Sequence, residues 1–146
     1  MLERFAMIKI TKETSVSIDD VLHLYQAVGW TNYTNQPQML AQALSHSLAT
    51  YLAHDGEKIV SLVRLVGDGF SSVFVQDLIV LPSYQRQGIG SSMMKQALAD
   101  YKDAYQIQLA TDESEKTLEF YRSLGFETLS TYDCTGMIWV DRKTFK

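Results

Sequence analysis

Apolar residues along the first third of the chain predict one short strand and two helices. The strand covers residues 7–10, and helical spacing of apolar residues follows over 18–28 and again over 37–48. Pro37 suits the first turn of the second helix, because that turn needs no backbone N–H from its first residue. The stretch 30–36 between the two helices is polar and aromatic, and we expect a loop there.

The middle of the chain predicts strands joined by tight turns. The apolar runs 49–54 and 58–66 flank Asp55-Gly56, a dipeptide that favours a two-residue hairpin turn. The next run, 72–81, is almost continuously apolar apart from Gln76-Asp77, so both faces of this strand should be covered.

Helices and strands alternate over the rest of the chain. We expect a helix over 88–105, a strand over 107–110 and a helix around 118–124. The stretches 125–132 and 137–140 are predicted as two final strands. This order indicates an α/β (α+β) protein, and 146 residues suffice for a single domain with a buried core. Residues 1–6 are a candidate N-terminal extension, because Met7 offers an alternative start.

Composition narrows the classes of partner. The net charge of −4 argues against a nucleic-acid-binding protein, and no stretch is apolar enough to span a membrane. A single cysteine permits no internal disulfide, which together with the lack of an apolar signal segment favours a cytoplasmic protein. The three histidines show no spacing typical of metal ligands, so we expect no metal.

A glycine-containing loop between a strand and a helix is the strongest functional signal. Two glycines without Cβ atoms allow a sharp turn and a close approach to a ligand. The first amides of the following helix lack partners inside the helix and favour an anion, to which Arg86 adds a positive charge. An ordinary glycine-capped turn is the alternative interpretation. The loop consists of Gln85, Arg86, Gln87, Gly88, Ile89, Gly90 and Ser91, and the hydroxyl of Ser91 or Ser92 can cap the helix or donate to a phosphate.

Two motifs carry a resemblance to a known family. Gln85-x-x-Gly88-x-Gly90 resembles the Arg/Gln-x-x-Gly-x-Gly/Ala signature of the GCN5-related N-acetyltransferases (GNAT). Phe120-Tyr121 followed by Gly125-Phe126 resembles a second landmark of that family, and the order of elements agrees over nearly the whole chain. The resemblance implies a mixed, mostly antiparallel sheet of six to seven strands flanked by four helices. Its fourth and fifth strands would run parallel and splay apart around acetyl-coenzyme A.

The resemblance also implies roles for individual residues. The glycine loop would hold the pyrophosphate of acetyl-coenzyme A, and the backbone of Leu78, Ile79 and Val80 would pair with its pantetheine arm. A bulge in this strand would aim an amide at the acetyl carbonyl. Ser114 stands where the family often has Asn, and it can still donate a hydrogen bond to the cofactor.

Tyr121 and Asp77 are the candidate catalytic residues. Tyr121 occupies the position of a family tyrosine that assists departure of the coenzyme A thiolate; the alternative is a half-buried core tyrosine. Asp77 is a candidate acceptor for the proton of the amine, directly or through water. It is equally well interpreted as a structural residue that bonds a neighbouring loop or Arg64.

The acceptor side carries fewer signals. Trp30 and Tyr33 can form an aromatic wall for an amine, although an aromatic staple beneath the loop explains Trp30 as well. Arg64 can pair with Asp77 or Asp68 or bind a substrate carboxylate, and Gln76 is a further candidate contact.

The resemblance therefore predicts a transferase that uses acetyl-coenzyme A to acetylate a primary amine of a small molecule or peptide. Family members are often dimers, so a homodimer is expected. A non-catalytic acyl-coenzyme A sensor is the alternative hypothesis, and an interaction domain without the cofactor site is a third.

Overall fold

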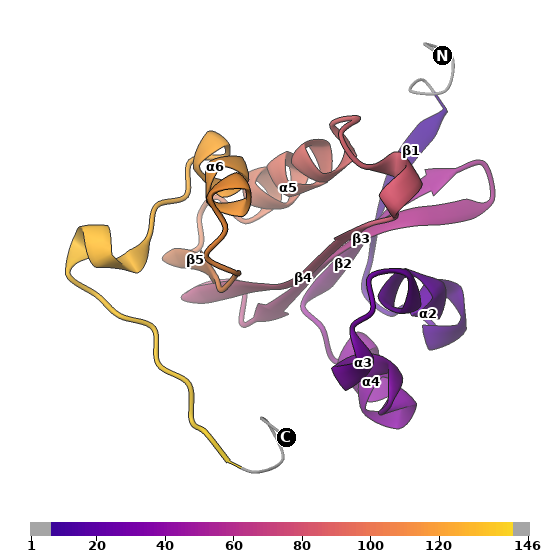
Figure 1. Ribbon diagram of the computed structural model, residues 1–146, viewed down its shortest axis with the longest axis horizontal. Helices are drawn as coiled ribbons and strands as arrows, with labels where there is room; N and C mark the ends of the chain where they lie inside the picture. Colours follow the sequence, from indigo (N-terminus) through magenta and orange to yellow (C-terminus); the bar gives the residue numbers. More distant parts are fainter. Residues whose placement is uncertain (1–6, 142–146) are drawn as a thin grey trace. The chain divides into compact units, whose positions relative to one another are not determined.

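The computed structural model describes residues 7–141 as twelve short elements (Figure 1). The chain divides into two compact units, Met1–Ala110 and Thr111–Lys146, which we describe separately. The prediction of an N-terminal extension at 1–6 lies outside the described residues, and the prediction of one domain stays a prediction. The first unit contains β1 (Ile8–Glu13), α2 (Ile18–Ala27), α3 (Thr31–Thr34), α4 (Pro37–Ser45), β2 (Ala49–Asp55), β3 (Lys58–Gly67), β4 (Ser72–Val80), the 3₁₀ helix η1 (Pro82–Tyr84), α5 (Ile89–Asp100) and β5 (Gln106–Leu109).

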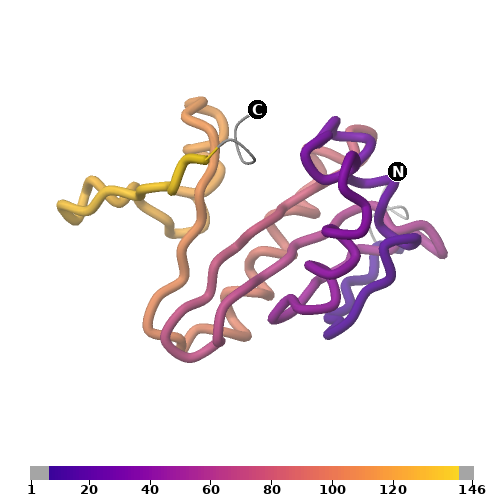
Figure 2. Tube along the Cα trace, turned by 90° about the horizontal axis from the view of Figure 1, so that it is seen from below, coloured from indigo at the N-terminus to yellow at the C-terminus, as the bar shows by residue number. Residues whose placement is uncertain are grey.

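A five-stranded mixed sheet forms the centre of the first unit. Its order is β1-β2-β3-β4-β5; the first four strands pair antiparallel, whereas β4 and β5 pair in parallel. Figure 2 shows β3 and β4 as long neighbouring segments joined by a tight turn, with the turn before β5 beside it. A parallel pair needs a long crossover, and α5 supplies it.

Helices cover both faces of this sheet. In Figure 1, α5 lies along one face, and α2 with α3 and α4 lies on the other. Sequence sets the helix starts: the Ser17 side chain accepts a hydrogen bond from the Asp19 amide at the start of α2, and Pro37 begins α4. The core between the layers is apolar and includes Val21, Leu24, Leu40, Leu44, Leu62, Val63, Ile79, Met93 and Met94.

The second unit is mostly irregular in its described part. It contains α6 (Glu115–Ser123) and the 3₁₀ helix η2 (Leu129–Tyr132). The predicted strands over 125–132 and 137–140 were wrong: η2 occupies part of the first, and the second has no regular structure. Isolated apolar stretches have strand propensity, but a strand forms only where another strand accepts its hydrogen bonds.

The structure thus differs from the prediction in the number of strands and helices but agrees with it in fold class. Residues 7–141 form five strands rather than six or seven, and five α-helices rather than four, because the expected loop 30–36 contains α3. The parallel fourth and fifth strands are confirmed. None of the helices in residues 7–141 combines the length and the apolar composition that a membrane crossing requires.

Candidate functional site

The N-terminus of α5 is shaped to receive an anion. The loop before it turns sharply, because Arg86 and Gly88 both have positive φ angles, 62° and 80°. Gly88 is the N-cap, no side chain caps the helix, and no acidic residue stands in its first turn. The helices α2 and α6, in contrast, have serine caps and acidic first turns. The first amides of α5 are thus left for an external acceptor.

Side chains around this loop hold its shape. Gln85 donates its Nε2 hydrogen to the Val80 carbonyl at 3.0 Å, and Gln87 donates to the Ser83 carbonyl at 3.3 Å. Arg86, Gly88 and Ser92 are exposed, and Ser91 is partly exposed. Ile89 is buried, so its side chain belongs to the core and only its amide is placed for a ligand.

The edge of β4 that faces β5 is paired over only half its length. The parallel pairs run from Ser72–Gln106 to Val75–Leu109, where β5 ends, and within residues 7–141 no strand pairs with 76–80 on that side. Leu81 N–H donates to the Val60 carbonyl, and antiparallel pairs alternate, so the backbone groups of Leu78 and Val80 face away from β3. The open edge is therefore formed by alternate residues of β4.

Ile79 does not share this orientation. Its carbonyl accepts a hydrogen bond from the Ser61 hydroxyl of β3 at 2.7 Å, and its side chain is buried. Its predicted backbone contact with a ligand at the open edge conflicts with this register, because its polar groups already face the neighbouring strand.

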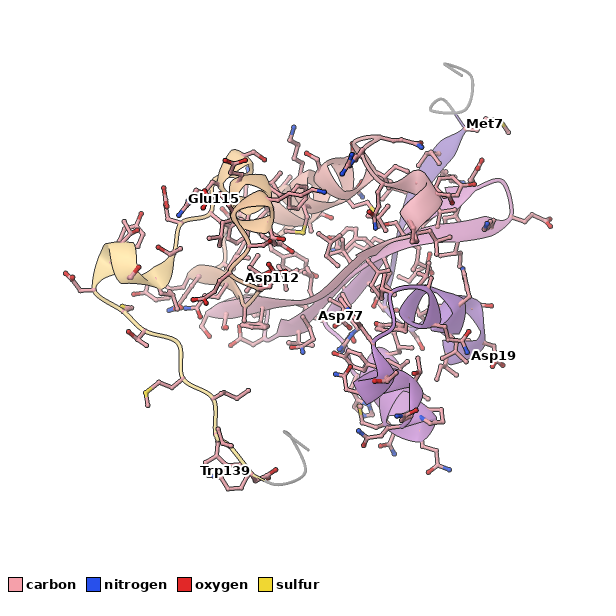
Figure 3. All side chains as sticks on the ribbon, in the orientation of Figure 1. Met7, Asp19, Asp77, Asp112, Glu115 and Trp139 are labelled. Carbon is pink, nitrogen blue, oxygen red and sulfur yellow. The ribbon has the colours of Figure 1, made fainter. Side chains whose placement is uncertain are left out.

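Asp77 lies at the centre of a buried polar cluster between β4 and the helices α2 and α3 (Figure 3). Its Oδ2 accepts hydrogen bonds from the Tyr25 hydroxyl at 2.8 Å and from Arg64 Nε at 2.7 Å, and its Oδ1 accepts one from the Tyr33 hydroxyl at 2.8 Å. Asp77 and Arg64 are each 3% exposed. The structural alternative, a bond to Arg64, is thus present, whereas proton acceptance by Asp77 stays a prediction.

Burial and charge shape the titration of this cluster. Burial raises the pKa of Tyr25 and of Tyr33, and the negative charge of Asp77 raises both further. Burial alone would lower the pKa of Arg64, but the Asp77 carboxylate outweighs it and the pKa is raised. Both phenols therefore stay neutral and Arg64 stays charged at neutral pH.

The other partner considered for Arg64 is engaged elsewhere. Asp68 accepts hydrogen bonds from the backbone amides of Phe70, Ser71 and Ser72 in the β3–β4 turn. Hydrogen bonds from the Ser71 hydroxyl and from these amides hold the pKa of Asp68 below its usual range. Arg64 is thus committed to the buried cluster and is not free for a substrate carboxylate.

The aromatic residues of the acceptor side form a packed group. The rings of Trp30 and Tyr33 lie 6.3 Å apart, and Tyr25 contacts both, at 6.2 Å and 5.0 Å between centroids. Tyr33 is buried and Trp30 is partly exposed. From the sequence, Tyr25 was expected only among the apolar positions of the helix over 18–28. Its hydrogen bond to Asp77 could have been found from the sequence, because a buried aspartate needs donors and a tyrosine on the core-facing side of a helix can supply one.

The second unit holds Tyr121 and Ser114. Tyr121 packs against Phe120 and Phe126, at 5.0 Å and 5.9 Å between ring centroids. Burial raises the pKa of Tyr121, and the charge of Asp112 raises it further, so the phenol keeps its proton at neutral pH. Ser114 is the N-cap of α6, and its hydroxyl oxygen accepts from the Thr117 amide at 3.3 Å. Its predicted contact with a cofactor is untested.

Metal ligands do not cluster in the described part of the chain. Among residues 7–141, no three His, Cys, Asp or Glu side chains gather closely enough to hold a metal ion.

Comparison with known proteins identifies the family. The sequence model of the acetyltransferase (GNAT) domain matches residues 46–128, more than half of the 146-residue chain. Serotonin N-acetyltransferase 2 (chloroplastic) from Oryza sativa is 28% identical over 117 residues, which cover 77% of this chain and 58% of the rice protein. GCN5-related N-acetyltransferase 1 (chloroplastic) from Arabidopsis thaliana is 25% identical, over 90% of this chain and 66% of its own. The chain thus spans less than two thirds of these curated relatives.

Solved structures agree with this assignment. A GNAT-family acetyltransferase from Streptococcus pneumoniae TIGR4 is 71% identical and superposes with a TM-score of 0.86, over 93% of this chain and 99% of that one. Together with the family match, the parallel pairing of β4 and β5 and the uncapped start of α5, this likeness shows that the chain belongs to the GNAT family of N-acetyltransferases, enzymes of the transferase class.

Proposed function

We propose that this protein transfers an acetyl group from acetyl-coenzyme A directly to a primary amine of a small molecule or peptide. The observation that carries the proposal is the uncapped N-terminus of α5, preceded by the positive-φ residues Arg86 and Gly88. Unpartnered amides with no competing carboxylate suit a pyrophosphate. A structural neighbour from Elizabethkingia anophelis, 22% identical with a TM-score of 0.61, has acetyl-coenzyme A bound, which agrees with this proposal.

Different residues of the first unit would bind different parts of acetyl-coenzyme A. The amides of Ile89, Gly90 and Ser91 would hold the pyrophosphate, with Arg86 adding positive charge. The outward-facing backbone of Leu78 and Val80 would pair with the pantetheine arm as a short added strand. When bound, acetyl-coenzyme A supplies an acetyl group activated as a thioester.

The reaction also requires two proton transfers, one from the attacking amine and one to the departing sulfur. The attacking amine must lose a proton, because a primary amine with a pKa of about 10.4 is mostly protonated at neutral pH. From the family resemblance we assign Tyr121 to the leaving side, where its phenol, kept neutral by burial, would hold a proton for the departing sulfur. Asp77 already accepts three hydrogen bonds and is 3% exposed, so the proton of the amine would reach it through water rather than directly.

The identity of the amine is open within this class. The name of the rice relative indicates serotonin, an arylalkylamine, as the acceptor of that protein. The half-exposed Trp30 supports an amine with an aromatic or cationic group here as well. A cytoplasmic location and a homodimer stay predictions from composition and family.

Calorimetric titration with acetyl-coenzyme A tests the proposal. We expect binding by the wild-type protein and its loss in Gly88→Glu, which places a carboxylate at the anion site. Gly56→Glu is the matched control, because Gly56 also has positive φ and open space around its Cβ position but lies in the β2–β3 turn. A panel of primary amines is then screened for release of free thiol. Binding without acetylation of any amine would contradict the transferase proposal and favour an acyl-coenzyme A sensor.

A further inference from the structure

A bulge in β4 places two successive side chains on the same face of the sheet. Asp77 pairs with Arg64 of β3, whereas Leu65, the next residue of β3, pairs with Val75, so Gln76 is the extra residue. Successive side chains of a regular strand point to opposite faces. Here Gln76 Nε2 and Asp77 Oδ1 both reach the Tyr33 hydroxyl, at 3.4 Å and 2.8 Å.

The hydrogen bonds of Tyr33 determine which end of the Gln76 amide faces outward. The single Tyr33 proton goes to Asp77, an acceptor only, and Arg64 Nη2 donates to the Tyr33 oxygen at 3.3 Å. With that proton used, the Tyr33 oxygen can only accept from Gln76, which must present its amide nitrogen. Gln76 Oε1 is then directed away from the cluster as a hydrogen-bond acceptor.

Gln76 differs from the rest of the cluster in its exposure. Its side chain is exposed, whereas Tyr25, Tyr33, Arg64 and Asp77 are buried. It also directly follows Val75, the last residue of β4 that pairs with β5, so it stands where that pairing ends. In the proposed function the acetyl carbonyl would lie at a bulge of this strand, so the outward oxygen of Gln76, the extra residue of the bulge, would face the arriving amine.

We propose that Gln76 binds the acceptor amine through Oε1, and that Tyr33, fixed by Asp77 and Arg64, is the positioning residue that orients this amide. The inference rests on the proposed function, and it specifies how that site selects its substrate. The ligand is a primary amine or ammonium group, whose N–H groups donate to Oε1.

Steady-state kinetics with the best amine of the panel test this proposal. Gln76→Met removes both polar ends of the side chain at similar volume. Loss of one hydrogen bond should raise KM for the amine by about 3- to 10-fold. The affinity for acetyl-coenzyme A, measured by calorimetry, should stay unchanged. Gln96→Met, at an exposed glutamine of α5, is the matched control and should change neither value.

Tyr33→Phe tests the positioning role. It should raise KM for the amine in the same direction, and in its presence Gln76→Met should add little, because the amide has already lost its fixed orientation. Independent, additive effects of the two changes would overturn the positioning role. An unchanged KM in Gln76→Met with intact turnover would overturn the proposal, and Gln76→Met, an exposed substitution, should not impair folding. Failure of the proposed function is distinguishable, because wild-type protein would then acetylate no amine at all, and this proposal would fail with it.

Discussion

Replacing Asp77 by Asn is the most direct test of the buried cluster. The substitution keeps the shape of the side chain but leaves the Arg64 guanidinium, 3% exposed, without a counter-charge. Breaking a buried ion pair by removing one partner costs about 3–5 kcal/mol. The amide oxygen of the substituted side chain can still accept up to two of the three hydrogen bonds, so we expect a loss near the lower end, about 3 kcal/mol.

Urea unfolding of the wild-type protein and the variant measures this loss. For a chain of this size, each kcal/mol lowers Tm by about 2–4 °C, so a fall of about 6–12 °C should accompany it. Asp100→Asn is the matched control: Asp100 also accepts from a tyrosine hydroxyl, Tyr51 at 2.7 Å, but its cationic partner Lys12 is 3.9 Å away, and Lys12 and Asp100 are both exposed. We expect about 1 kcal/mol there.

The difference in unfolding free energy between Asp77→Asn and Asp100→Asn measures the effect of burying the charge. If Asp77→Asn cost no more stability than Asp100→Asn at an unchanged m-value, the buried charge pair would not make the dominant contribution to the stability of this cluster. A double variant, Arg64→Met with Asp77→Leu, should recover only part of the lost stability, because it removes both charges together but leaves the Tyr25 and Tyr33 hydroxyls without their acceptor.

Three further predictions concern Tyr121, the glycine turns and the hydroxyl of Tyr25. Tyr121→Phe should lower kcat by about a hundredfold while the Kd for acetyl-coenzyme A stays unchanged, and an unaltered kcat would exclude Tyr121 from the reaction. Gly67→Ala should lower the free energy of unfolding by more than about 2 kcal/mol, because its φ is +123° and its Cβ would collide with the Ser72 carbonyl oxygen. Gly56→Ala, with open space around it, should cost clearly less in the same denaturant titration. Alkaline pH should destabilise the protein. Burial, and then the charge of Asp77, raises the pKa of Tyr25 in the folded state above the unfolded value of 10.0. The neutral phenol therefore contributes its full share to the unfolding free energy below about pH 10, and this share is lost as the pH rises toward the folded-state pKa. Tyr25→Phe should flatten the fall in unfolding free energy above about pH 10, and an equally steep fall would contradict this origin.

Local patterns predicted the central sheet well. The Asp55-Gly56 turn, the apolar run of β4 and the glycine loop before α5 are each specified by a few neighbouring residues. The parallel pairing of β4 and β5 was implied by the family resemblance, and the helix between them supplies the crossover that it requires. Such features depend on backbone geometry and short-range hydrogen bonds, which are determined by residues close together in the sequence.

Long-range partners were harder to predict. Pairing of Arg64 with Asp77 was one of three alternatives, and the participation of Tyr25 was missed, because its distance in sequence from Asp77 hides their contact. Met137–Val140 shows the opposite error: β-prone residues without a pairing edge do not form a strand, so local composition alone misled there.

The missing cap of α5 has a thermodynamic consequence. A helix start without a side-chain partner is less stable alone, and a ligand that supplies the acceptor stabilises the folded state by mass action. At a ligand concentration of 100 times Kd this amounts to about 2.7 kcal/mol, enough to raise Tm by about 5–10 °C in a chain of this length. The heat resistance of the protein would then rise and fall with the coenzyme A ester supply, so that its melting temperature reports how fully the binding loop is occupied.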